Sequence, residues 1–230
     1  MSFVCLNPEK VDKIVRKNLL QIQADIAPCK PNIIAVTKYF DNQAMVAAYQ
    51  AGLRDFAEAR INVAIEKIEM LPQEIKNNSM FHFIGHLQTN KVAKVIKYFD
   101  FIHSVDSLHL AQKISQEAKK INKIQKVFLE VNFSNEEQKF GFSQRMLEDE
   151  FEQIVALDNL EIQGLMSMSP LGAEESFLVE LFTSVKNVQD ALAQKYNIEM
   201  SETSMGMSQD YMVAVKCGAT KLRIGRKLFT

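Results

Sequence analysis

Short apolar runs alternate with amphipathic stretches along most of the chain. The apolar runs lie at residues 33–38, 55–59, 81–86, 101–105, 127–132, 162–168, 200–205 and 221–224. Several are apolar at successive positions, which is typical of strands buried on both faces of a parallel sheet. Between the runs, apolar residues recur at helical spacing, most clearly over residues 177–192. The pattern predicts eight strands that alternate with helices.

A further helix is predicted before the first strand. Asn7 and Pro8 are typical of a helix start, as the N-cap and the first helical residue. Apolar residues at helical spacing continue to about residue 27, and Pro28 and Pro31 follow. The helix should therefore end just before the first strand.

The alternation of strands and helices fits either a closed barrel or an open doubly wound sheet. Eight strands favour closure, and the few residues after the eighth strand leave no room for a further helix. The N-terminal helix could fill that vacant position. No change in composition marks a domain boundary. The sequence thus predicts an α/β fold, a single (β/α)8 TIM-type barrel spanning residues 1–230 and closed by an N-terminal helix.

Composition excludes several classes of protein. The formal net charge of −1 provides no long-range attraction for nucleic acid. Cys5, Cys29 and Cys217 are far apart and form no Cys-x-x-Cys pair, which fits a reducing compartment. The first residues do not resemble a signal peptide, and no apolar stretch approaches the roughly 18 residues of a membrane span. We expect a cytoplasmic protein that binds neither nucleic acid nor a membrane.

Active sites of such barrels lie at the carboxyl ends of the strands, so the polar residues there are candidates for chemistry. Lys38 ends the first predicted strand, which places its amine at or near an apolar interior. Desolvation favours the neutral, nucleophilic amine that Schiff-base chemistry requires. A lysine that extends to solvent from a strand end is the alternative interpretation.

The loops after the last two strands favour phosphate binding in these barrels. Ser208 would start the helix after the seventh strand, where free N–H groups suit an anion, although it could be a simple helix cap. Gly225 allows its N–H to approach an anion closely, and Arg223 and Arg226 supply positive charge. A basic surface turn is the alternative there. Together these residues put a lysine nucleophile and a phosphate cradle on one rim.

Eight short motifs extend this pattern over nearly the whole chain. They are AVTK at 35–38, FHFIGHLQTNK at 81–91, HSVD at 103–106, VNFS at 131–134, KFG at 139–141 and GLMSM at 164–168, with SMGMSQD at 204–210 running on to RIG at 223–225. In these motifs the chain resembles the pyridoxal phosphate homeostasis proteins, whose fold is like the N-terminal barrel of alanine racemase.

The resemblance implies a cofactor and its site. It implies that pyridoxal 5′-phosphate forms a Schiff base on Lys38, and that Ser208, Gly225 and the backbone of Arg226 hold the phosphate. Arg223 is similar in position to the arginine that faces the pyridine nitrogen in the racemases. An arginine there would leave that nitrogen unprotonated and weaken the ring as an electron sink, which suits carbanion chemistry poorly.

The chain also departs from the family pattern. Ala57 and Ala59 stand where Gly-Glu-Asn is usual, so an amide near the cofactor is lost; Arg60 or Asn62 could replace its hydrogen bond. Arg226 replaces a small hydroxyl residue, and its guanidinium could contact the phosphate instead. These changes concern the contacts around the cofactor and leave the Schiff base intact.

His82 and His86 suggest a metal site at first sight. On a helix they could share an ion, but on a strand they lie roughly 13 Å apart. A packed or hydrogen-bonded histidine at the rim is the better interpretation, and we expect no metal.

Three functions compete: a non-catalytic carrier or buffer of pyridoxal 5′-phosphate, a racemase-like enzyme, and a barrel that binds another phosphorylated metabolite without a Schiff base. Racemases of this fold pair the lysine with a second base on a separate domain. Only five residues follow Gly225, so we expect no such domain, unless Tyr39 or Tyr211 acts as that base. The carrier is the favoured prediction, as a monomer without catalytic residues whose partners are the cofactor and the apo-enzymes that use it.

Overall fold

The computed structural model describes residues 8–133 and 140–230. Cys5, the expected cap at Asn7, and the motif residues Ser134 and Lys139 lie outside the described residues. The strands are β1 (Asn32–Val36), β2 (Asp55–Glu58), β3 (Met80–Phe83), β4 (Phe101–Val105), β5 (Gln125–Val131), β6 (Leu160–Ser167), β7 (Glu202–Met207) and β8 (Lys221–Ile224). The helices are α1 (Pro8–Asp25), α2 (Asn42–Gln50), α3 (Ile61–Glu69), α4 (Gln73–Asn77), the 3-10 helix η1 (Thr89–Lys91), α5 (Val92–Tyr98), α6 (Leu108–Lys120), α7 (Gln144–Val155), α8 (Glu175–Tyr196), α9 (Tyr211–Lys216) and α10 (Arg226–Phe229).

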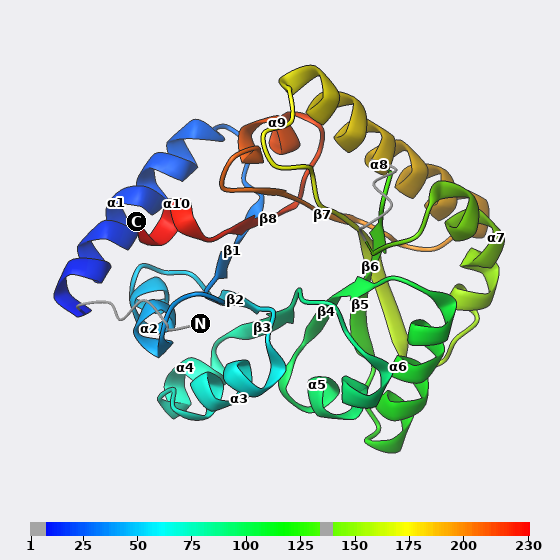
Figure 1. Ribbon diagram of the computed structural model, residues 1–230, viewed down its shortest axis with the longest axis horizontal. Coiled ribbons are helices and arrows are strands. Elements are labelled where there is room, and N and C mark those ends of the chain that lie inside the picture. Colours follow the sequence, from blue (N-terminus) through cyan, green and yellow to red (C-terminus); the bar gives the residue numbers. More distant parts are fainter. Residues whose placement is uncertain (1–7, 134–139) are drawn as a thin grey trace.

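The strands form a closed parallel barrel. In the described residues each strand pairs with the next along the chain, and β1 pairs with β8. Figure 1 shows the helices arranged around these strands. The predicted TIM-type (β/α)8 fold is therefore confirmed.

Side chains of the strands alternate between the helix layer and the barrel interior. In β1, Ile33 and Ala35 belong to the large core that the helices cover, whereas Ile34 and Val36 form a separate cluster with Ala57. Such alternation follows from the two-residue period of a strand. Phe101, Phe128 and Met166 make a second cluster apart from the main core. The interior is thus packed with side chains, and the polar groups among them are of functional interest.

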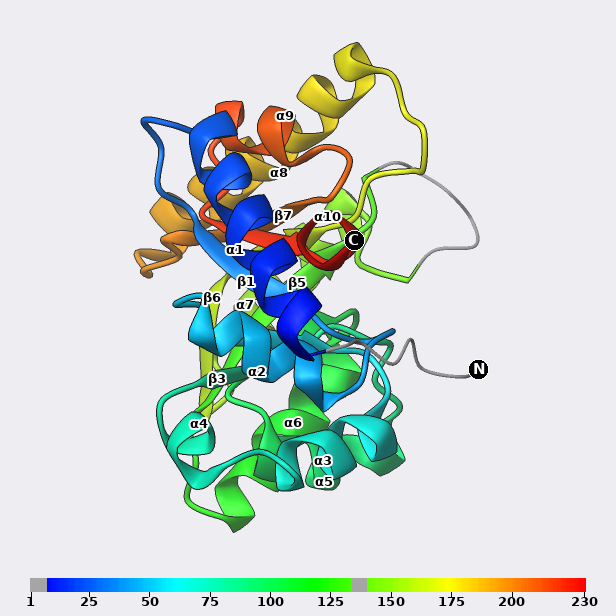
Figure 2. The same ribbon diagram turned by 90° about the vertical axis from the view of Figure 1, so that its left-hand side faces the viewer.

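The N-terminal helix lies against both α2 and the chain's last helix (Figures 1 and 2). Asn18 on α1 donates hydrogen bonds to the carbonyls of Leu228 and Thr230, at 3.2 and 3.1 Å. The expectation that no helix follows the eighth strand was wrong, because α10 occupies four residues there. Phe229 of this turn packs on Phe40 with ring centroids 4.8 Å apart, which anchors it. The N-terminal helix therefore shares its predicted place with a short C-terminal one.

Six of the eight predicted strands differ in their bounds from the observed strands, and for the first and the seventh a competing hydrogen bond explains the difference. The first ends at Val36, since the Phe40 N–H donates to the Thr37 carbonyl at 3.0 Å and turns the chain. The seventh starts at Glu202, because the Met200 carbonyl accepts from Gln189 of α8 at 2.8 Å. Among the described helices, none combines the length and hydropathy of a membrane span.

Candidate functional site

A cavity of about 400 Å³ opens at the carboxyl ends of the strands, a volume suited to a small cofactor. Its lining comes from the ends of β1, β6, β7 and β8 and the loops that follow them, with Ile84 after β3. All five residues predicted as the cofactor site line it: Lys38, Ser208, Arg223, Gly225 and Arg226. The barrel thus brings together residues that are up to 188 positions apart in the sequence (38 to 226).

Lys38 is half-buried at the rim of this cavity, in the turn after β1. Its Nζ lies 5.2 Å from the centroid of the Tyr39 ring. Arg60 donates from Nη2 to the Lys38 carbonyl at 2.8 Å, whereas Asn62 accepts from Lys94 at 3.0 Å. Of the two residues considered as replacements for the missing amide, Arg60 therefore supports the lysine turn.

A buried ion pair beneath Lys38 holds the same turn. Lys67 of α3 pairs with Glu58 and donates to the carbonyls of Thr37 at 2.8 Å and Phe40 at 2.9 Å. The Thr37 hydroxyl donates to the same Glu58 oxygen at 2.7 Å. Burial lowers the pKa of Lys67, and the Glu58 carboxylate opposes this. Lys67 therefore holds the carbonyls of Thr37 and Phe40, the residues on either side of Lys38 and Tyr39.

Ser208 and Gly225 come from two different loops and meet at the cavity. The Ser208 hydroxyl oxygen accepts from the N–H groups of Gly225 and Lys227, each at 3.3 Å. The expectation that Ser208 starts the next helix was wrong, because α9 begins at Tyr211. Two backbone N–H groups nevertheless converge here on one oxygen, in the arrangement that an oxyanion ligand requires. Arg226 is exposed beside them.

Arg223 is the buried cation of the cavity. It is 3% exposed, and its guanidinium donates to the Ser204 carbonyl at 2.7 Å, the Ser204 hydroxyl at 2.6 Å and the Ser167 carbonyl at 2.8 Å. Burial lowers its pKa to about 10, and Asp210 and Glu130 oppose this. It therefore remains a cation at neutral pH.

The two tyrosines weighed as a second base differ in position. Tyr39 lines the cavity and is about half exposed. Tyr211 is buried, does not line the cavity, and donates its hydroxyl to Asp25. Only Tyr39 is therefore placed to act on a ligand there.

The two histidines considered for a metal lie in different environments. His82 is fully buried inside the barrel, so placing it at the rim was wrong, whereas His86 is at the rim and stacks on Phe140 at 3.8 Å. His82 contacts Asp55 and His103, each at 2.9 Å. Among the described residues, no group of three or more histidine, cysteine, aspartate or glutamate side chains could hold a metal ion.

Sequence reasoning missed the Lys67–Glu58 pair and the partners of His82. A signal existed for Lys67, which lies three residues after Ala64 and directly before Ile68 on the buried side of α3. For His82, the apolar neighbours Phe81 and Phe83 face the helices, so the two-residue period directs His82 inward.

Comparison with known proteins agrees with this geometry. Residues 13–230 match the family described as alanine racemase, N-terminal domain. A pyridoxal phosphate homeostasis protein of Synechocystis sp. is 41% identical over 88% of this chain and 92% of its own length. One from Aquifex aeolicus is 37% identical over 79% of this chain and 78% of its own.

Solved structures extend the comparison. PipY of Synechococcus elongatus with PLP bound is 33% identical, with a TM-score of 0.84 over 94% of this chain and 100% of its own. Alanine racemase of Bartonella henselae, 20% identical, has a TM-score of 0.74 over 94% of this chain and 61% of its own, and shares the fold. The chain belongs to the alanine racemase N-terminal domain family and, within it, to the pyridoxal phosphate homeostasis proteins.

Proposed function

We propose that this protein binds pyridoxal 5′-phosphate in the cavity as a Schiff base on Lys38, and serves as a non-catalytic carrier or buffer in intracellular cofactor homeostasis. The observation that carries the proposal is that the Lys38 amine and the converging N–H groups of Gly225 and Lys227 belong to one rim. The cavity volume of about 400 Å³ fits one such cofactor.

Each part of the cofactor has a suitable group. Lys38 supplies the amine for its aldehyde. Ser208, Gly225 and Arg226 would hold the phosphate, through backbone N–H groups and one guanidinium. Arg223, a cation at neutral pH, would donate a hydrogen bond to the ring nitrogen. The names of the curated relatives and the PLP bound in PipY support the same ligand.

The absence of catalysis is part of the proposal. A ring nitrogen that accepts a hydrogen bond from Arg223 carries no proton, so the ring withdraws electrons weakly. The alternative, a racemase-like enzyme, would need a second base, and Tyr39 is the tyrosine that lines the cavity. We further propose that the protein acts as one domain and a monomer in the cytoplasm, and passes cofactor to apo-enzymes.

The test is reductive labelling. Protein loaded with pyridoxal 5′-phosphate should retain a pyridoxyl group after borohydride, on the peptide that contains Lys38. Lys38→Ala should abolish the label, and Lys30→Ala, at an exposed lysine outside the cavity, should retain it. A label on another lysine would refute the assignment. Alanine, serine and glutamate enantiomers in deuterated water should show no turnover in the usual range of about 1–10³ s⁻¹; Lys38-dependent racemisation at such a rate would refute the carrier role.

A further inference from the structure

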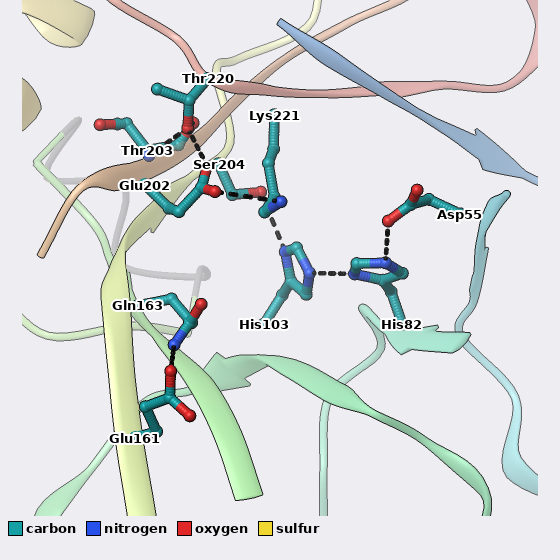
Figure 3. A network of polar contacts seen from close by, with 10 residues as sticks. All are labelled: Asp55, His82, His103, Glu161, Gln163, Glu202, Thr203, Ser204, Thr220 and Lys221. Atoms are coloured by element: carbon teal, nitrogen blue, oxygen red, sulfur yellow. Dashed lines mark hydrogen bonds and ion pairs between the residues drawn. The ribbon is translucent and has the colours of Figure 1, made fainter. Parts of the chain in front are cut away.

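A line of polar side chains runs through the barrel interior from Asp55 to Ser204 (Figure 3). Asp55 at the start of β2 contacts His82 Nε2 at 2.9 Å, and His82 Nδ1 contacts His103 Nε2 at 2.9 Å. His103 Nδ1 lies 2.9 Å from the Ser204 hydroxyl, which accepts from Arg223. This line of hydrogen bonds therefore links the Asp55 carboxylate at the start of β2 to the Arg223 cation on β8.

The positions of the hydrogen atoms in this line of hydrogen bonds follow from which groups can donate and which can accept. Arg223 has only donors, so the Ser204 oxygen accepts from it and the hydroxyl proton is free to go to His103 Nδ1. His103 then carries its proton on Nε2 and donates to His82 Nδ1. His82 in turn donates from Nε2 to the Asp55 carboxylate. Each hydrogen bond then has one donor and one acceptor, and in each of them the donor is the group nearer to Arg223 and the acceptor the group nearer to Asp55.

The charges around the two histidines favour their neutral forms. Burial lowers the pKa of His82, which Asp55 opposes and Lys221 reinforces. Burial, then His82, Arg223 and Lys221, hold the pKa of His103 well below its usual value. Asp100 is the further acidic group acting on His82. Phe101 stacks on His82 and Phe128 on His103, at 4.4 and 4.3 Å, so these faces are closed to water.

We propose that Asp55, His82, His103 and Ser204 are positioning residues for Arg223. The Asp55 carboxylate sets the tautomer of both histidines, which makes the Ser204 oxygen an acceptor for the guanidinium. Three hydrogen bonds to the protein, among the described residues, then leave two of its five N–H groups for the cavity. The inference rests on the proposed function: the site selects a ligand that presents a neutral, hydrogen-bond-accepting ring nitrogen to Arg223.

The tautomers can be measured without any ligand. The chain has four histidines, so their ring ¹⁵N signals can be assigned by one substitution each. We expect His82 and His103 to be neutral, protonated on Nε2, from pH 6 to 8 in the apo protein. Asp55→Asn, which can donate as well as accept, should allow the reversed tautomers to appear. Imidazolium forms or Nδ1–H tautomers in the wild-type protein at neutral pH would overturn the assignment.

Cofactor affinity tests the link to Arg223. Asp55→Asn should raise the Kd for pyridoxal 5′-phosphate by about three- to tenfold, the effect of weakening one hydrogen bond. Glu161→Gln is the matched control. Glu161 on β6 accepts from Gln163, and among the described residues it has no hydrogen bond to Asp55, His82, His103 or Ser204 (Figure 3). If the wild-type protein binds the cofactor and Asp55→Asn binds it with the same Kd, this inference is overturned and the proposed function stands. No binding by the wild-type protein overturns the proposed function, and the ligand selection with it.

Discussion

Glu130 provides a sharp test of the electrostatics inside the barrel. It lies on β5, is 5% exposed, and has its pKa raised from 4.5 to about 7 by burial and by Asp106, while Arg223 opposes the rise. The native protein therefore keeps a proton on this carboxyl group at pH values where an exposed glutamate is ionised. Glu130→Gln would make the neutral form permanent with little change in shape.

The magnitude follows from the two pKa values. A rise from 4.5 to about 7 corresponds to about 3 kcal/mol in favour of the neutral acid. The stability that Glu130 contributes is complete below about pH 4.5 and is lost as the pH rises through about 7, because the unfolded chain ionises first. Glu130→Gln should therefore be more stable than the wild type by about 3 kcal/mol at pH 8, and by less than about 1 kcal/mol at pH 5.

Urea unfolding of the apo protein at pH 5, 6, 7 and 8 measures this difference. Glu180→Gln, at an exposed glutamate on α8, serves as control and should show no pH-dependent gain. A stability difference for Glu130→Gln that is the same at pH 5 and pH 8 would refute the reasoning. So would a variant that is less stable than the wild type at pH 8.

Further substitutions probe the turn that carries Lys38 and the lining of the cavity. Lys67→Met should lower the free energy of unfolding by about 3–5 kcal/mol, measured with urea, because Glu58 is left as a buried charge without its lysine. The double variant Lys67→Met/Glu58→Gln should recover most of this stability. An equal loss in the single and the double variant would contradict the pairing. Gly225→Val should weaken binding of pyridoxal 5′-phosphate about tenfold or more, the effect of losing one hydrogen bond to a charged group, with little effect on pyridoxal. Equal loss for both ligands, measured by fluorescence titration, would place the phosphate elsewhere.

The barrel could be predicted from the sequence because its strands are buried on both faces. Continuous apolar runs mark such strands, and eight of them in alternation with helices leave few arrangements. Lys38 and Gly225 were identified because the carboxyl end of each strand is the known place of chemistry in this fold. Gly164 of β6 illustrates a constraint that is invisible in the pattern: an added Cβ would lie 1.6 Å from the Glu202 carbonyl oxygen of β7.

The contacts between polar side chains could not be predicted in the same way. The pairing of His82 with His103 depends on the register of β3 against β4, where His82 lies opposite Phe101. The position of Ser208 depends on a loop conformation that brings it to Gly225, and the serine residue alone indicated a helix cap. Short-range patterns identify elements, whereas such contacts arise only when the barrel closes.

The lining of the cavity combines two kinds of surface that bear on ligand choice. Val36, Ile84 and Met166 provide apolar surface, whereas Arg223 and the Ser208–Gly225 contact provide cationic charge and N–H donors. A flat ring would cover the apolar part, while its nitrogen and its phosphate would each meet a donor. Each polar group that a ligand leaves unpaired costs about 1–3 kcal/mol. A ring without an acceptor would leave Arg223 unpaired, and a ligand without the phosphate would leave the N–H donors at Gly225 unpaired. Each of these ligands would therefore bind more weakly. Selectivity for pyridoxal 5′-phosphate would then come from the hydrogen-bond donors of the cavity, and Lys38 would make the bound state long-lived.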